Sequence, residues 1–318
     1  MSSHWTTADI PDQTGRRAII TGGNSGIGYP AALELARHGA TVVIACRDLA
    51  KGEAAAARIR HAIPQASIEV SELDLADLAD VQAFADRELA RDTPLDLLIN
   101  NAGVYAPPKR LQTKDSFELQ FGTNVLGHFA LTAHLLPALQ RAAASSPTAP
   151  RVVFIASIAH KHARIRFTDL QYHGNYSPTK SYGQSKLADL MLSSELDRRL
   201  RAGGETTSRI LSVAAHPGVA NTNLFQAGAY SHAETVMRRW AGHAIGLLLN
   251  SDVEGALPTL YAATAPGAKS GGYYGPQGFA EMRGGDVGPA RIAHQARDTE
   301  AAAKLWEICE DLTHTHLP

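Results

Sequence analysis

The sequence predicts an α/β fold, in which a doubly wound, mainly parallel sheet is covered by helices on both faces. Short apolar runs alternate with longer helical patterns from residue 15 to residue 265. These runs are apolar almost throughout, as expected of strands in a parallel sheet that helices cover on both sides. A glycine-rich turn joins the first apolar run to the first helical pattern, which is another feature of this fold class.

The predicted elements follow this alternation in order. Strands are expected at residues 16–21, 41–45, 67–73, 95–99, 151–156 and 209–215. Helices are expected from the glycine-rich turn to His38, at 49–62, and near 77–91, 115–140, 181–201 and 252–264. The β-branched and apolar composition of the short runs favours strands, and Gly39 ends the first helix.

No break in composition interrupts the alternation, so we expect a single domain over residues 1–318. The stretch 141–151, rich in Ala, Ser and Pro, is interpreted as a surface loop and not as a linker between domains. The core of the domain would span residues 15–265, and residues 266–318 would form a C-terminal extension.

Composition argues against several classes of protein. The 30 Lys and Arg residues balance 31 Asp and Glu residues, which gives no electrostatic basis for a nucleic-acid partner. Cys46 and Cys309 form no CxxC motif, and the 14 histidines lack HExxH or paired Cys/His spacing, so neither a disulfide framework nor a metal site is predicted. No signal peptide or apolar stretch of ~18 residues is recognisable. We expect a cytoplasmic protein without a membrane span.

The glycine-rich turn predicts a phosphate-binding site. Residues 21–28 read TGGNSGIG, with the spacing GxxxGxG and not the GxGxxG of the commonest Rossmann-type enzymes. Glycines let the backbone turn tightly and approach a pyrophosphate, while the following helix presents free N–H groups and a positive dipole. Pro30 is tolerated if it lies among the first residues of that helix.

Three further motifs follow the glycine-rich turn in consistent order. They are Asn100-Asn101-Ala102-Gly103 after the fourth strand, Ser157 after the fifth, and Tyr182-Gly-Gln-Ser-Lys186 at the start of a helix. Over residues 15–265 the chain resembles the single-domain branch of the short-chain dehydrogenase/reductase superfamily. The sequences IACRD (44–48), LINNAG (98–103), TNVLGHF (123–129) and HPGV (216–219), and the 25-residue separation of Ser157 from Tyr182, are most similar to the retinol-dehydrogenase-like group.

The resemblance implies catalytic roles for four residues. Tyr182 would be the general acid/base, Ser157 would hydrogen-bond the substrate oxygen, and Asn124 would support a proton relay to solvent. Lys186 would hold the nicotinamide ribose and lower the pKa of the phenol, which is ~10 in free tyrosine. Ala156 stands where many relatives have a second serine, a position without a catalytic role.

The resemblance also implies a set of residues that bind a nicotinamide cofactor. Besides Tyr182 and Lys186 they are Gly22, Asn24, Ser25, Gly26, Ile27 and Gly28 in the turn, Asp74 and Leu75 at the adenine, Asn101, Ala102 and Gly103 near the adenosine, and Pro217, Gly218, Val219 and Thr222 at the carboxamide.

The residues after the second strand bear on the choice of cofactor. In this fold an acidic residue there binds the 2′-hydroxyl of the adenosine ribose, whereas an arginine accommodates a 2′-phosphate. The sequence reads Cys46-Arg47-Asp48. Asp48 could bind a ribose hydroxyl or cap the next helix, and its place suits the cap better. We therefore expect a preference for NADP(H), with NAD(H) as the alternative cofactor.

Two segments bear on the substrate. Residues 159–180, which include the apolar and aromatic side chains of Ile165, Phe167, Leu170, Tyr172 and Tyr176, are expected to shape a pocket for a fairly bulky apolar ketone, aldehyde or secondary alcohol. The alternative is a surface excursion that blocks one mode of subunit contact. The segment GGYYGPQG (271–278), in the substrate-side extension, is either a last strand and a wall of the pocket or an edge cover.

The sequence and this resemblance thus predict hydride transfer between NADP(H) and an alcohol or carbonyl compound. One alternative is a non-catalytic nucleotide-sensing protein, which is expected to lack Tyr182, Lys186 or Ser157. The other is an epimerase or dehydratase acting on a nucleotide sugar, for which a larger C-terminal domain is expected. Substrate identity, reaction direction and assembly into a homo-oligomer stay open.

Overall fold

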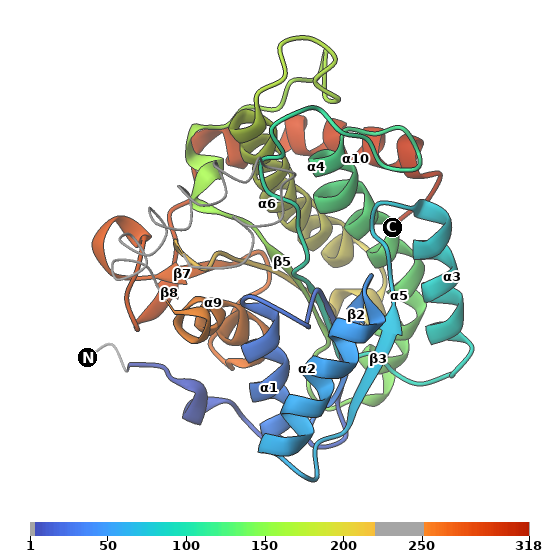
Figure 1. Cartoon of the computed structure of the whole chain (residues 1–318), viewed down its shortest axis with the longest axis vertical. Helices are drawn as coiled ribbons and strands as arrows, with labels where there is room; N and C mark the ends of the chain where they lie inside the picture. The colour runs from blue at the N-terminus through green and yellow to red at the C-terminus, as the bar shows by residue number, and fades with distance from the viewer. Residues whose placement is uncertain (1–3, 220–250, 318) are drawn as a thin grey trace.

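The computed structural model describes residues 4–219 and 251–317, and its centre is one eight-stranded sheet (Figure 1). The strand order is β3-β2-β1-β4-β5-β6-β7-β8, with β1 to β7 parallel and β8 antiparallel to β7. The strands are β1 (Arg17–Thr21), β2 (Thr41–Cys46), β3 (Ile68–Glu72), β4 (Leu97–Asn100), β5 (Arg151–Ile155), β6 (Leu211–Ala215), β7 (Tyr273–Pro276) and β8 (Val287–Pro289). The predicted fold class is confirmed.

Helices cover both faces of the sheet. The α-helices are α1 (Gly28–Arg37), α2 (Leu49–Ala62), α3 (Leu78–Leu89), α4 (Leu119–Phe121), α5 (Gly127–Ser145), α6 (Pro178–Ala202), α7 (Glu205–Ser208), α9 (Asp252–Thr264) and α10 (Thr299–Thr313). Shorter helical turns are η1 (Thr7–Asp9), the π-helical η2 (Gly122–Leu126), η3 (Ile158–His162), η5 (Phe279–Glu281) and η6 (His294–Arg297). No helix in the described ranges is both long and apolar enough to cross a membrane.

Two apolar cores lie on opposite faces of the sheet, because successive strand residues point to opposite sides. Ile19 packs in the core that β1 shares with α3, α5, α6 and α10, whereas Ile20 packs in the core formed with α1, α2 and α9. Figure 1 shows these two groups of helices on either side of the strands. Burial on both faces explains why the strands are apolar throughout.

The order of the strands places a switch point between β1 and β4. From β1 the chain moves outward to β2 and β3, then returns to pair β4 with the other side of β1. Ligands of doubly wound sheets bind at the carboxyl ends of the strands at such a point. Here the two strand ends are tied together directly, since Asn101 Nδ2 donates to the Thr21 carbonyl at 2.7 Å, and the Asn101 N–H donates to Thr21 Oγ1 at 2.9 Å.

Most predicted elements match the structure to within a few residues, and two differ for local reasons. The helix predicted near 115–140 is interrupted by the π-helical turn η2, and α5 then continues to Ser145. The first part of the predicted loop 141–151 is therefore helical, because Ala142, Ala143 and Ala144 are strong helix formers. Pro30 is the third residue of α1, where a proline costs no hydrogen bond.

The C-terminal extension completes both the sheet and one core. Residues 273–276 form β7, which pairs in parallel with β6. The segment GGYYGPQG therefore contains a strand, as the first of its two alternatives predicted. At the end of the chain, α10 packs against α6 and α5 through Trp306, whose ring meets Phe129 edge to face at 4.9 Å. The Arg199 guanidinium lies over the same indole at 4.7 Å.

Removing the Phe129 ring tests how α10 is held on α5. Phe129→Ala should lower the free energy of unfolding by about 3–5 kcal/mol, because it leaves a cavity against Trp306 in a buried core. Urea denaturation of the full chain measures this change. Phe279 is the control: its side chain is 83% exposed, so Phe279→Ala should stay within about 0.5 kcal/mol. Equal losses in the two variants would contradict this account of α10.

Candidate active site

A cavity of about 1020 Å³ opens at the carboxyl ends of the central strands. Its walls come from the glycine-rich turn, the ends of β4 and β5, the start of α6, and the C-terminal extension. The lining residues include Gly22, Ser25, Gly26, Ile27, Asn101, Ala102, Gly103, Tyr105, Ser157, Ile158, Ala159, Lys161, His162, Thr179, Tyr182, Lys186, Pro217, Gly218, Val219, Gln277, Gly278, Glu281, Met282 and Arg291. Ligand pockets typically measure 300–1,000 Å³, so this cavity has room for more than a small substrate.

The glycine-rich turn has the geometry that a phosphate site needs. Gly22 and Gly26 have positive φ values, +65° and +51°, which side chains other than glycine rarely adopt. A Cβ on Gly28 would lie 2.5 Å from the Gly22 carbonyl oxygen, so only glycine lets the turn close at the start of α1. Gly22, Ser25, Gly26 and Ile27 line the cavity, whereas Asn24 and Gly28 are not among its lining residues.

The turn after β4 also fits a nucleotide. Ala102 donates its N–H to Thr21 Oγ1 at 2.9 Å, and Ala102 and Gly103 line the cavity beside Asn101. The Asn101 Oδ1 atom is buried and accepts no hydrogen bond from the described residues. A buried acceptor without a protein partner is uncommon, and this one suits a ligand that donates a hydrogen bond. The residues present are thus consistent with a bound dinucleotide.

Tyr182 lies on α6 with its ring inside the cavity. It is 9% exposed and packs edge to face on Tyr105, with ring centroids 4.7 Å apart. Burial raises the pKa of its phenol, and the Lys186 ammonium and a hydrogen bond with Ser157 oppose this without reversing it. Lys186 therefore acts in the expected direction, while burial of the phenol has the larger and opposing effect on its pKa.

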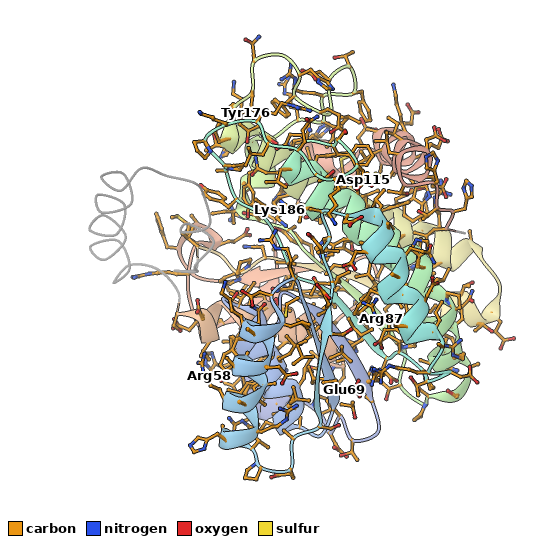
Figure 2. The ribbon with its side chains drawn as sticks, turned by 45° about the vertical axis from the view of Figure 1, so that its right-hand side comes forward. Arg58, Glu69, Arg87, Asp115, Tyr176 and Lys186 are labelled. Carbon is orange, nitrogen blue, oxygen red and sulfur yellow. The ribbon has the colours of Figure 1, made fainter. Side chains whose placement is uncertain are left out.

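Lys186 lies one helical turn after Tyr182, and Figure 2 shows it in the interior of the molecule. Its ammonium is 6.0 Å from the centre of the Tyr182 ring. It donates to the Ile155 carbonyl at 2.8 Å and to Asp189 Oδ2 at 2.9 Å. Burial disfavours the ammonium, yet the charge of Asp189 holds the pKa of Lys186 above its usual value. An ammonium has three protons to donate, so one stays available toward the cavity.

Asn124 lies behind the cavity, in the π-helical turn η2. Its side chain accepts from the Val104 N–H at 2.7 Å and donates to the Val104 carbonyl and to Ser185 Oγ. Its own carbonyl is bonded to His128 Nδ1 at 2.9 Å. Asn124 therefore fixes the chain after Gly103 next to Lys186; it is not among the lining residues.

The residues predicted at the adenine ring and at the 2′ position of the adenosine ribose are not among the described lining residues of the cavity. Arg47 is exposed after β2, and Asp48 caps α2 by accepting the Lys51 N–H at 3.0 Å, as its position suggested. Asp74 accepts the Ala76 N–H at 3.0 Å, while Leu75 is buried in a core. Of the residues predicted at the carboxamide, Pro217, Gly218 and Val219 line the cavity, and Thr222 falls outside the described residues.

The segment 159–180 contributes to the site differently from what its sequence indicates. Ala159, Lys161, His162 and Thr179 line the cavity. Ile165, Phe167 and Leu170 pack in a core instead, and the Tyr176 hydroxyl donates to the Pro107 carbonyl at 3.0 Å, near the top of Figure 2. None of the five apolar or aromatic residues expected at the pocket is among its described lining residues.

One wall of the cavity is charged and a buried carboxylate lies behind Lys186, and neither feature was predicted from the sequence. Lys161 donates to Glu281 at 2.6 Å, and Gln277, Gly278 and Arg291 lie on the same wall of the cavity. The end of the segment GGYYGPQG therefore lines the pocket, as the first of its two alternatives predicted. No local pattern brings residues 161 and 281 together. The ion pair of Asp189 could have been predicted from the sequence. Asp189 lies three residues after Lys186 on an apolar helix face, a spacing at which a carboxylate and an ammonium are neighbours. The described residues contain no group of three or more potential metal ligands.

Comparison with known proteins agrees with this geometry. The family model for short chain dehydrogenases matches residues 16–229. Retinol dehydrogenase 14 from Homo sapiens is 37% identical over 311 residues, covering 93% of this chain and 85% of that protein.

Two solved structures are also similar. An uncharacterised protein from Mycobacterium paratuberculosis is 41% identical, with 99% of both chains covered and a TM-score of 0.77. The Pseudomonas aeruginosa RhlG/NADP active-site complex is 25% identical, with 82% of this chain and 94% of that chain covered and a TM-score of 0.63. The chain therefore belongs to the short-chain dehydrogenase/reductase superfamily, in its retinol-dehydrogenase-like group, and is an oxidoreductase that acts on CH–OH groups.

Proposed function

We propose that the protein transfers hydride between NADP(H) and a fairly bulky, largely apolar ketone, aldehyde or secondary alcohol, with Tyr182 as the acid/base. The observation that carries this proposal is the placement of Tyr182, Ser157 and Lys186 in the cavity onto which the glycine-rich turn opens. A protein that only senses a nucleotide has no need of this trio. The NADP complex of RhlG is further support for a nicotinamide cofactor.

Each of the three residues has a distinct task in this proposal. A nicotinamide cofactor, when bound, would supply or accept the hydride. Ser157 and Tyr182 hydrogen-bond the carbonyl oxygen and polarise the carbon that receives the hydride. Burial raises the pKa of Tyr182, which keeps the phenol protonated near neutral pH, the form that donates a proton to the oxygen. Lys186 stabilises the phenolate that the transfer leaves behind and has a proton to offer a ribose hydroxyl.

The position of Arg47 supports the preference for NADP(H). It follows β2 at the carboxyl edge of the sheet, and among the described residues it forms no ion pair. Asp48 is occupied with the N-terminus of α2 and with the Lys51 ammonium at 2.9 Å. A guanidinium left without a protein carboxylate can meet the oxygens of a 2′-phosphate with two parallel hydrogen bonds.

The walls of the cavity support a substrate with an apolar body. Tyr105, Ile158, Val219 and Met282 offer apolar surface around the reacting end, and the volume suits a cofactor together with a bulky substrate. The Lys161–Glu281 pair faces the same space and gives the distant part of the pocket a polar wall.

Removing the Tyr182 hydroxyl tests the proposed chemistry. Tyr182→Phe keeps the packing against Tyr105 and deletes the proton, so turnover should fall ~10²–10⁴-fold while NADPH affinity changes little. NADPH oxidation with a panel of retinoid, steroid, aliphatic and aromatic carbonyl compounds measures the loss. Tyr176→Phe, outside the cavity lining, should retain most activity. A Tyr182→Phe enzyme with half of the wild-type turnover would remove Tyr182 from the mechanism.

Replacing Arg47 tests the cofactor preference. Arg47→Ala should weaken NADPH binding roughly ten- to a hundred-fold and leave NADH binding nearly unchanged, because a charge-assisted hydrogen bond contributes ~1.5–3 kcal/mol. Fluorescence titration with each cofactor gives the two Kd values. Lys51→Ala, which removes a nearby exposed cation, is the control for a general loss of charge. A wild-type kcat/KM with NADH equal to that with NADPH would contradict the proposal.

A further inference from the structure

Lys186 forms a buried ion pair that none of the catalytic roles considered above uses. Asp189 is on the same helix, α6, and its Oδ2 atom is 2.9 Å from the Lys186 Nζ atom. Asp189 is 3% exposed and Lys186 is 5% exposed. Burial raises the pKa of Asp189 to about 6, and the ammonium opposes this, so the carboxylate is ionised at neutral pH. The pair therefore combines two full charges inside the protein.

The pair also fixes where the ammonium lies. With the Ile155 carbonyl on one side and Asp189 on the other, two of its three protons are directed at the end of β5 and at α6. The ammonium stays 6.0 Å from the centre of the Tyr182 ring. A carboxylate this close to the ammonium offsets part of the favourable field that the ammonium alone would exert on a phenolate.

We propose that Asp189 is a positioning residue that acts through Lys186: it holds the ammonium at the end of β5 and offsets part of its field at Tyr182, which adds to the effect of burial in keeping Tyr182 a proton donor. This inference rests on the acid/base function proposed above for Tyr182. It also accounts for a buried carboxylate that makes no contact with the cavity, since Asp189 is not among the described lining residues.

Other titratable groups near the pair do not replace this effect. They are Tyr105 beside the Tyr182 ring, His128 on α5, Tyr273 on β7 and Cys309 on α10. Burial lowers the pKa of His128 to about 3 and raises the pKa values of Tyr273 and Cys309, so these three are neutral near pH 7. The charged groups that act on the pKa of Tyr182 are Lys186 and Asp189, both on α6. Lys161 on η3 and Glu281 on η5 line the same cavity and form an ion pair with each other.

Asp189→Asn separates the charge of Asp189 from its shape. The amide oxygen can still accept from the Lys186 ammonium, but the negative charge is gone. Because a nearby carboxylate disfavours the phenolate, its removal should lower the pKa of Tyr182 by on the order of one pH unit. Phenolate absorbance is titrated in the full chain without substrate, and the Tyr182 signal is obtained by subtracting matched Tyr182→Phe variants.

The second readout is the pH profile of alcohol oxidation, where the rising limb of kcat/KM should move to lower pH by the same amount. Asp197→Asn is the matched control, because Asp197 pairs with exposed Arg201 at the far end of α6, and it should shift neither readout. An unchanged or higher pKa of Tyr182 in the folded Asp189→Asn variant would overturn the inference, and far-UV circular dichroism shows whether the variant is folded. Failure of all panel compounds would count against the proposed function and leave the titration result standing.

Discussion

A lysine ammonium inside a protein needs oxygen atoms around it, and this requirement organises the site around Lys186. The Ile155 carbonyl at the end of β5 and the Asp189 carboxylate meet it. Because Lys186 and Tyr182 share one face of α6, holding the ammonium also sets the place of the phenol relative to the sheet. The desolvation that makes the ion pair necessary also keeps Tyr182 protonated.

The rest of the fold supports this arrangement from two directions. The switch point between β1 and β4 places the glycine-rich turn next to Asn101, where bonds to Thr21 join the two strand ends. On the other side, the C-terminal extension adds β7 and β8 to the sheet and packs Trp306 of α10 against Phe129. Glu281 of the extension accepts a hydrogen bond from Lys161, so the extension forms one wall of the pocket and earlier parts of the chain form the others.

Local patterns were enough to predict β1 to β6 and the glycine-rich turn, because each depends on residues close in sequence. The roles of Tyr182 and Lys186 followed from the family resemblance. Local patterns failed where distant segments meet. Ile165, Phe167 and Leu170 resembled a pocket lining but were needed to fill a core beside α6. The Lys161–Glu281 wall joins residues 120 positions apart. The net direction of the Tyr182 pKa depends on burial, which the spacing of Tyr182 and Lys186 alone does not reveal.

In the proposed mechanism, Tyr182 and Ser157 together hold the oxygen of the substrate. A crystal structure of the full chain with NADP⁺ and the best alcohol of the substrate panel would show whether they do. The alcohol oxygen should lie within ~2.6–3.2 Å of both Tyr182 Oη and Ser157 Oγ. An alcohol oxygen bound instead at the opposite wall, by Lys161 or His162 and beyond hydrogen-bond reach of Tyr182, would contradict this mechanism.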